Sequence, residues 1–224
     1  MAYVAGIDIG SRGTKAVILD ESRHVCGTAL VKTRPDFPGV AKEAMELALA
    51  EAGGRMEDVK YVTTTGLGRY NIPFRDLQIT DITCAARGAE FLFPNTACVL
   101  DVGGQSTRAI RLREGGKVKE FKSNDKCAAG SGGFLERAAH YLEIPLDQLG
   151  PLSMGSEKPT MISSVCAVLA NRKSSTSSAT GKASRTSFAA STIRLLRDPR
   201  LCSPVWGLKM RSPSSAAWRA RTEW

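Results

Sequence analysis

The stretch from Gly6 to Lys15 combines an aspartate with glycines and hydroxyl side chains in a pattern that suits phosphate chemistry. It reads Gly6-Ile-Asp8-Ile-Gly10-Ser11-Arg-Gly13-Thr14-Lys15. Glycines let backbone N–H groups come close to phosphate oxygens, and an aspartate at a strand end can hold Mg²⁺ through its water shell. Asp8 is therefore a catalytic candidate, and the phosphate-binding candidates are Gly10, Ser11, Gly13, Thr14 and Lys15. A simple turn, with Lys15 on the solvated surface, would also explain this stretch.

A second stretch repeats the pattern 93 positions later, counted from Asp8 to Asp101. It reads Leu100-Asp101-Val102-Gly103-Gly104-Gln105-Ser106. By the same reasoning, Asp101 and Gln105 are catalytic candidates, and Gly103 and Gly104 are phosphate-binding candidates. Two such stretches in one chain favour phosphate binding over a pair of unrelated turns.

The elements that position these residues are predicted to be β-hairpins within an α/β fold. Apolar, β-rich runs predict strands over residues 3–9, 14–19, 61–65, 97–102 and 106–112. Apolar residues at helical spacing predict helices over 39–53 and 80–92, with Gly53 ending the first and Thr80 capping the second. A third helix is expected after the glycine-rich stretch 128–133, and residues 162–169 form an apolar run.

The six cysteines are not spaced as in a zinc ribbon. They are Cys26, Cys84, Cys98, Cys127, Cys166 and Cys202. The chain starts without a basic leader and contains no run of about 18 apolar residues, so we predict a cytoplasmic protein without a membrane span. Most isolated cysteines of cytosolic proteins are small buried apolar residues, and we interpret Cys26, Cys84 and Cys98 in this way.

The segments around Cys127 and Cys166 are more specific. The first reads Ser123-Asn-Asp-Lys-Cys127-Ala-Ala-Gly-Ser-Gly-Gly-Phe-Leu135, and the second reads Ser163-Ser-Val-Cys166-Ala-Val168. Together with the two aspartate hairpins, they resemble the iron-sulfur ATPases that activate 2-hydroxyacyl-CoA dehydratases and the related subunits of benzoyl-CoA reductase. Segments 65–69 and 80–84 are also similar to that family. The resemblance covers roughly residues 3–170 and implies an actin-like (ribonuclease H-like) ATPase fold. The chain is expected to contain the first half of that fold and the start of its second half.

The resemblance also implies a function and cofactors. In that family, the cysteines matching Cys127 and Cys166 from two subunits hold one [4Fe-4S] cluster, which needs four thiolates. The expected protein is thus a homodimer that uses ATP and Mg²⁺ to drive an electron from ferredoxin or flavodoxin into a 2-hydroxyacyl-CoA dehydratase or aromatic acyl-CoA reductase. Because Cys127 precedes a helix, backbone N–H groups and the helix dipole are expected to stabilise its thiolate. No nucleic-acid or membrane partner is expected.

Two departures from the family pattern stand out. The second hairpin of the family continues Gly-Gly-Gln-Asp-x-Lys, whereas this chain has Ser106 in place of the aspartate and Arg108 in place of the lysine. The family's Cys-His after its Thr-Glu-Ile segment is Cys84-Ala85 here. The first departure removes a carboxylate that could organise Mg²⁺ or water.

Residues 171–224 differ in composition from the rest of the chain. They hold eleven Lys or Arg against two Asp or Glu, which accounts for the whole net charge of +9. Codons allowed for Ala170–Ser178 and for Lys182–Arg197, regrouped by one fixed offset, can spell the continuation expected for the family. We therefore divide the chain into an ATPase portion, 1–170, and a frameshifted tail, 171–224, which we expect to be disordered. ATPase activity of the chain as written is expected to be weak or absent.

Two other functions remain compatible with parts of the sequence. A sugar or small-molecule kinase of the same fold would use similar aspartate hairpins, but it would contain no iron. A basic nucleic-acid-binding protein would depend on residues 171–224, because residues 1–170 are electrically neutral.

Overall fold

The computed structural model describes residues 2–123 and 131–154. The chain divides into two compact units, Met1–Phe134 and Leu135–Trp224, and each is described by itself. Cys127, Cys166 and the expected boundary at residue 170 lie outside the described residues. Among the described residues, no helix is both long and apolar enough to cross a membrane.

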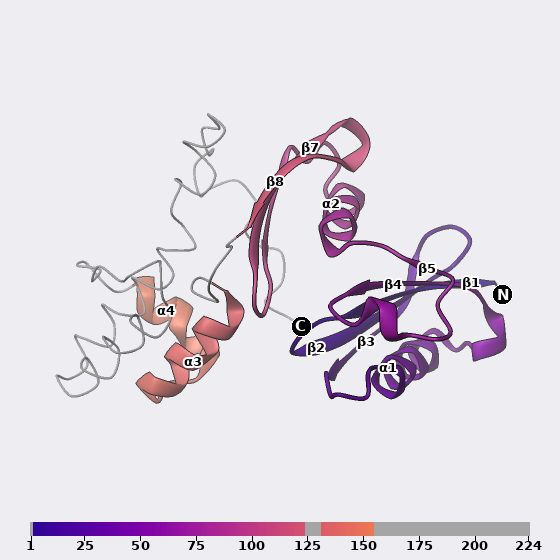
Figure 1. The fold of residues 1–224 in the computed structure, drawn as a ribbon, viewed down its shortest axis with the longest axis horizontal. Coiled ribbons are helices and arrows are strands. Elements are labelled where there is room, and N and C mark those ends of the chain that lie inside the picture. Colours follow the sequence, from indigo (N-terminus) through magenta and orange to yellow (C-terminus); the bar gives the residue numbers. More distant parts are fainter. Residues whose placement is uncertain (1, 124–130, 155–224) are drawn as a thin grey trace. The chain divides into compact units, whose positions relative to one another are not determined.

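The first sheet has five strands in the order β3-β2-β1-β4-β5 (Figure 1). The strands are β1 (Tyr3–Ile9), β2 (Gly13–Leu19), β3 (Val25–Lys32), β4 (Val59–Gly66) and β5 (Leu77–Gln78). Strand β1 pairs antiparallel with β2 and parallel with β4, which places the end of β1 beside the end of β4. The predicted strands over 3–9, 14–19 and 61–65 are confirmed.

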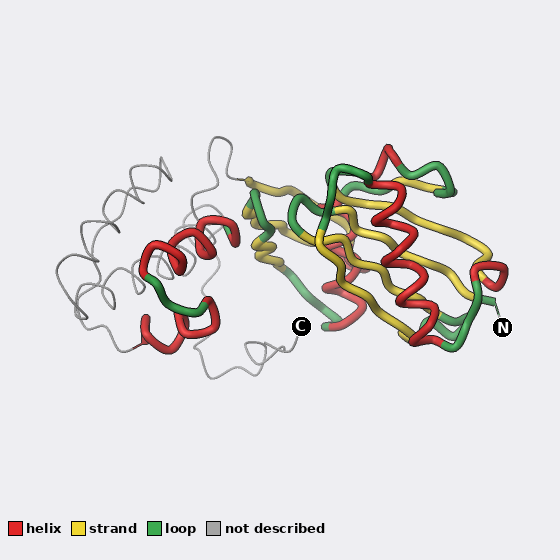
Figure 2. The backbone as a smooth tube through the Cα atoms, turned by 90° about the horizontal axis from the view of Figure 1, so that it is seen from below, coloured by secondary structure: helices red, strands yellow, loops and turns green. Residues whose placement is uncertain are grey.

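Helix α1 (Phe37–Ala52) covers one face of this sheet (Figure 2). The Asp36 side chain caps its start by accepting a hydrogen bond from Gly39 N, and Gly53 ends it in the left-handed conformation at φ 66°. The helix packs very closely on β3, because a Cβ added at Gly27 would lie 2.0 Å from the Ala48 carbonyl oxygen. This contact fixes β3 against α1.

The opposite face of the first sheet is apolar and exposed in the part of the chain that the structure describes. Val4, Val25, Leu30 and Tyr61 alternate with core residues along their strands and are 42–59% exposed. Side chains of this size normally pack against a second layer. The first sheet is thus covered by α1 on one side only within the described residues.

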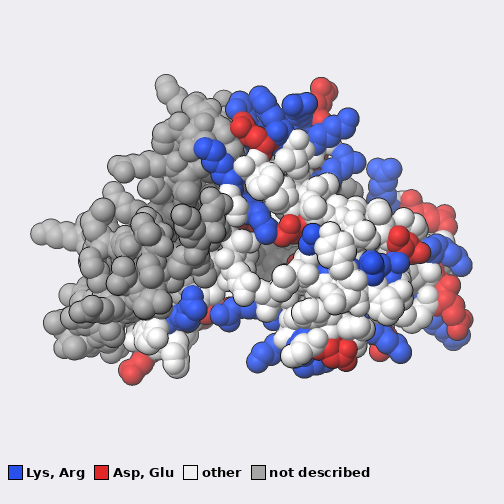
Figure 3. All heavy atoms as spheres, viewed as in Figure 1, with Lys and Arg blue, Asp and Glu red and all other residues white. Residues whose placement is uncertain are grey.

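The second sheet has the order β6-β7-β8 and belongs to the same unit. Its strands are β6 (Cys98–Val102), β7 (Thr107–Arg113) and β8 (Lys117–Ser123), and helix α2 (Asp81–Leu92) packs against it through Ala86, Ile110 and Leu112. Exposed basic side chains gather over the β7–β8 hairpin (Figure 3), namely Arg113, Lys117, Lys119 and Lys122. The predicted elements over 80–92, 97–102 and 106–112 are confirmed, whereas β8 was not predicted.

The remaining elements are short or begin near the end of the first unit. They are α3 (Gly132–Leu142), α4 (Leu149–Met154) and the 3₁₀ turns Met56–Asp58, Arg69–Asn71, Glu114–Gly116 and Leu146–Gln148. The helix expected after the glycine-rich stretch is therefore present as α3. Its buried side chains are Phe134, Ala138, Ala139 and Leu142, whereas Tyr141 is 46% exposed.

Shortening a side chain to alanine should lower the free energy of unfolding by different amounts on the two faces of the first sheet. Ile18 is 0% exposed beneath α1, so Ile18→Ala should lower the free energy of unfolding by about 2–5 kcal/mol. Leu30 is 59% exposed, so Leu30→Ala should lower it by less than about 0.5 kcal/mol. Urea denaturation of the two full-length variants measures both values, and equal losses would show that the second face is covered in solution.

Candidate functional site

Asp8 lies near the end of β1, directly opposite Lys15 on β2. The Lys15 Nζ and Asp8 Oδ2 atoms are 2.9 Å apart, and both side chains are partly exposed. The end of β4 presses against the same carboxylate: Gly66 has φ +85°, and a Cβ added there would lie 2.4 Å from Asp8 Oδ1. A glycine at position 66 is therefore required for Asp8 to keep its place.

Asp101 occupies the equivalent position at the end of β6, directly opposite Arg108 on β7. The Arg108 Nη1 and Asp101 Oδ2 atoms are 3.4 Å apart. In both hairpins, the aspartate faces a basic residue seven positions later. The repeat found in the sequence thus extends to a pair of opposite charges at each hairpin.

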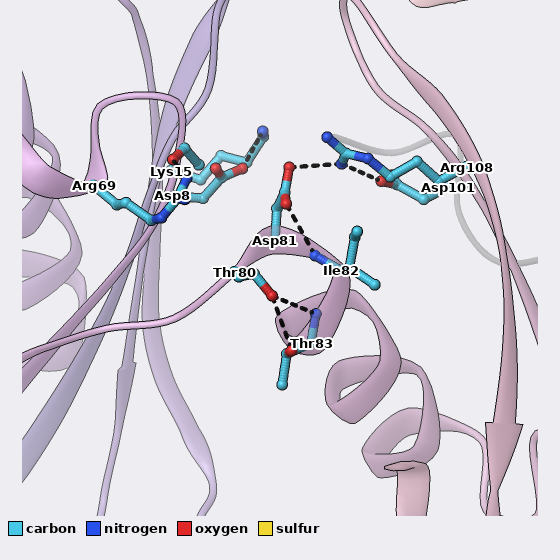
Figure 4. Close-up of polar contacts among 10 residues, drawn as sticks. Asp8, Lys15, Arg69, Thr80, Asp81, Ile82, Thr83, Asp101 and Arg108 are labelled. Atoms are coloured by element: carbon cyan, nitrogen blue, oxygen red, sulfur yellow. Dashed lines mark hydrogen bonds and ion pairs between the residues drawn. The ribbon is translucent and has the colours of Figure 1, made fainter. Parts of the chain in front are cut away.

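Asp81 joins this group from a third element, and the sequence analysis did not single it out. It is the first residue of α2, directly after the Thr80 cap, and its Oδ1 accepts a hydrogen bond from Ile82 N. Its Oδ2 lies 2.6 Å from Arg108 Nη1, and Figure 4 shows the two side chains pointing toward each other. An acidic residue after a helix cap is common in itself, so the signal was present in the segment 80–84 but not distinctive.

The charges around Asp101 leave its carboxylate short of positive partners. Burial raises the pKa of Asp101, the Asp81 and Asp8 carboxylates raise it further, and Arg108 acts in the opposite direction. A bound cation would offset this repulsion, and carboxylate oxygens are the ligands that Mg²⁺ prefers. No three His, Cys, Asp or Glu side chains in the described ranges are close enough to hold one metal ion. Proteins usually give Mg²⁺ one or two carboxylates beside water and phosphate oxygens, and the carboxylates of this group are of that kind.

The two glycine-rich turns close in the same way. Gly10 N donates to Gly13 O at 3.2 Å, and Gly103 N donates to Ser106 O at 2.8 Å. The tips of the turns lie side by side, because a Cβ added at Gly104 would be 3.1 Å from Ser11 Oγ. The structure thus brings together Gly10, Ser11 and Gly13 from the first turn and Gly103 and Gly104 from the second, with Gln105 exposed at the tip.

Thr14 is placed differently from its neighbours. It is fully buried, and its hydroxyl is 2.9 Å from that of Thr33, which in turn donates to Gly10 O at 2.8 Å. Thr14 therefore supports the first turn from the interior, where its hydroxyl is already paired. Direct phosphate contact, expected for Thr14 from the sequence, has no support in this arrangement.

The second turn is joined to the start of α3 by two backbone hydrogen bonds. Gly132 N donates to Gly103 O and Gly133 N donates to Gly104 O, each at 2.9 Å. A Cβ added at Gly133 would be 2.6 Å from Gly104 O, so only glycine permits this contact. The first two amides of α3 thus donate to the second turn.

The described cysteines have structural surroundings. Cys26 packs against the main core, and Cys84 is half-buried on α2. Burial raises the pKa of the Cys84 thiol, and the Asp8 and Asp81 charges add to this effect, so the neutral thiol is favoured. Arg69 donates to Gly66 O at 2.8 Å and lies over the Tyr70 ring.

Replacing Gly66 with alanine should disturb Asp8 directly. Gly66→Ala combines an unfavourable φ with a collision at Asp8 and Ile9, whereas Gly53→Ala has a similar φ but no atom within 4 Å of the new Cβ. We expect Gly53→Ala to reduce the free energy of unfolding by about 1 kcal/mol and to leave Mg·ATP binding unchanged. Gly66→Ala should weaken that binding at least tenfold, measured by titration calorimetry. Equal binding by both variants would contradict the placement of Asp8.

The raised pKa of Asp101 predicts a particular pH dependence of stability. The folded protein holds this proton to higher pH than the unfolded chain, so Asp101 lowers stability as the pH rises above about 3.8. Asp101→Asn should therefore gain melting temperature relative to the unsubstituted chain between pH 4 and pH 7. Asp20→Asn is the control of opposite sign, because a hydrogen bond from the His24 backbone lowers the pKa of Asp20. A shift of the same sign in both variants would refute the assignment.

Comparison with known proteins identifies the family of the chain. The model of the BadF/BadG/BcrA/BcrD ATPase family matches residues 5–196. The activator of lactoyl-CoA dehydratase of Anaerotignum propionicum is 40% identical over 168 residues, which are 75% of this chain and 64% of that protein. A benzoyl-CoA reductase subunit of Thauera aromatica is 41% identical over 175 residues, which are 76% of this chain and 61% of that protein.

A solved structure agrees with these relatives. The activator of the 2-hydroxyisocaproyl-CoA dehydratase from Clostridium difficile, with bound ADPNP, matches with a TM-score of 0.80 and 32% identity, covering 94% of this chain and 78% of that one. The chain spans a little less than two thirds of the length of the curated relatives that it matches. With its two sheets and repeated aspartate hairpins, it has the actin-like ATPase fold and belongs to the BadF/BadG/BcrA/BcrD ATPase family.

Proposed function

We propose that the chain is, or derives from, an ATP-hydrolysing activator that drives an electron into a 2-hydroxyacyl-CoA dehydratase or an aromatic acyl-CoA reductase. The observation that carries the proposal is the pair of aspartate hairpins whose glycine turns lie side by side. Membership of a family that contains activators and a benzoyl-CoA reductase component supports it over the kinase and nucleic-acid alternatives.

The nucleotide part of the proposal uses residues of both hairpins. Asp8 and Asp101 would hold Mg²⁺ through water, and the ion would neutralise charge that develops on the phosphates. Backbone amides around Gly10, Ser11 and the Gly103-Gly104 turn would bind phosphate oxygens. Exposed Gln105 is the candidate for orienting the attacking water, and the ion pair with Lys15 holds the Asp8 carboxylate in place. The solved relative that holds ADPNP supports this part.

The electron-transfer part concerns residues outside the described ranges. Cys127 and Cys166 from two copies of the chain would hold one [4Fe-4S] cluster, which would accept an electron from ferredoxin or flavodoxin and pass it on. The resemblance of the segments around these cysteines supports this assignment. Among the described cysteines, the half-buried Cys84 with its raised pKa is a poor thiolate ligand. The homodimer, the donor and a cytoplasmic location remain predictions.

The tail interpretation also remains a prediction. If residues 171–224 arise from a shifted reading frame, the ATP site lacks its native second half, and hydrolysis should be weak. Sequencing of the coding DNA decides it: a shift of one frame near codon 170 must yield the family continuation.

Anaerobic reconstitution of the full chain with iron and sulfide tests the proposed cluster. We expect about two iron atoms per chain, because a four-iron cluster is shared by two subunits. Cys127→Ser and Cys166→Ser should each abolish iron binding and the absorbance near 400 nm, a wavelength typical of such clusters. Cys98→Ser is the control and should retain both. Iron that stays bound in the Cys127 and Cys166 variants would overturn the cluster assignment.

A further inference from the structure

A single guanidinium nitrogen of Arg108 contacts two carboxylates from different elements. Arg108 Nη1 lies 2.6 Å from Asp81 Oδ2 and 3.4 Å from Asp101 Oδ2. The Arg108 side chain is only 19% exposed, whereas the two carboxylates are 35% and 31% exposed. One positive charge is thus shared by two aspartates, in surroundings that are partly shielded from water.

The position of this bridge differs from that of the corresponding pair in the first hairpin. Lys15 and Asp8 belong to one hairpin, and the Lys15 side chain is 58% exposed. Arg108 instead connects the second hairpin to Asp81, at the start of the helix that follows β5 of the first sheet (Figure 4). The bridge therefore fixes the start of α2 against one of the two phosphate turns.

We propose that Arg108 is a positioning residue that neutralises Asp81 and Asp101 while no divalent cation is bound and releases them when Mg·nucleotide enters. This inference rests on the proposed nucleotide site. Both a divalent cation and a guanidinium neutralise carboxylates, so they compete for the same charges. The released guanidinium has phosphate oxygens to bind, because its fork of N–H groups matches them.

The proposal predicts opposite effects on two kinds of ligand. In Arg108→Gln, the carboxylates lose their internal cation, so Mn²⁺ alone should bind more tightly, roughly tenfold. Nucleotide without metal should bind more weakly by a similar factor, because its phosphates then meet unscreened negative charge. An arginine that only supports the fold would change both affinities in the same direction.

Asp81 variants supply the reverse change. Asp81→Asn keeps the shape of the side chain but removes one negative charge, so it should weaken Mn²⁺ binding and strengthen the binding of metal-free nucleotide. The double variant Asp81→Asn/Arg108→Gln restores the net charge, and both affinities should return toward those of the unsubstituted chain. Asp81→Asn also keeps the test decisive if Arg108→Gln does not fold.

The matched control lies on the same strand. Arg111 Nη1 is 3.3 Å from Glu120 Oε1, in an ion pair between β7 and β8 that has no part in the aspartate group. Arg111→Gln removes the same charge from the same sheet and should leave both affinities unchanged. Arg108→Lys keeps the charge, so its Mn²⁺ affinity should stay close to that of the unsubstituted chain.

The experiment measures full-length variants in two ways. Electron paramagnetic resonance follows Mn²⁺ binding without nucleotide, and calorimetry follows ADPNP binding with EDTA or with Mg²⁺. Weaker Mn²⁺ binding by Arg108→Gln, or equal effects of Arg108→Gln and Arg111→Gln, would overturn the role of Arg108. If the unsubstituted chain binds no ADPNP under either condition, the proposed nucleotide function fails, whereas the Mn²⁺ measurement still decides whether Arg108 competes with a cation.

Discussion

The antiparallel register of the two hairpins is the constraint on which the rest of the site depends. In each hairpin, a turn closed by a glycine amide sets the register so that an aspartate faces a basic residue, Lys15 for Asp8 and Arg108 for Asp101. A slip of one residue would turn these side chains to the other face of the sheet. The glycines that close the two turns therefore also fix which charges meet.

The two hairpins share this geometry but differ in their surroundings. The pair at Asp8 is open to water, whereas the pair at Asp101 is more buried and receives a second carboxylate from Asp81. Ser106 replaces an acidic residue of the family pattern, yet the negative charge near Asp101 is still high, because Asp81 approaches from α2. The charge balance of the site is thus set by contacts between elements as well as within each hairpin.

Local patterns explain which features could be predicted from the sequence. The strands at 3–9 and 97–102 and the Thr80 cap follow from alternation and capping, and the structure has them. Strand β8 was not predicted, because Lys117–Ser123 is a polar edge strand with no buried side chain. Thr14 shares its face with Ala16 and Ile18, so alternation along β2 could have placed it inside. Asp81 and Arg108 lie in distant segments of the sequence, so no local pattern predicts their contact.

The hydrogen bonds between the second turn and α3 connect the proposed nucleotide site to the helix that follows Cys127 in the sequence. Gly103 and Gly104 accept hydrogen bonds from the first two amides of α3, and a side chain at Gly133 would crowd this contact. A turn that shifts when nucleotide binds must carry the start of α3 with it or break both bonds. Because Cys127 precedes α3 by only a few residues in the sequence, such a shift would act close to the proposed cluster ligand. The same backbone contact that positions the phosphate turn can therefore transmit its movement.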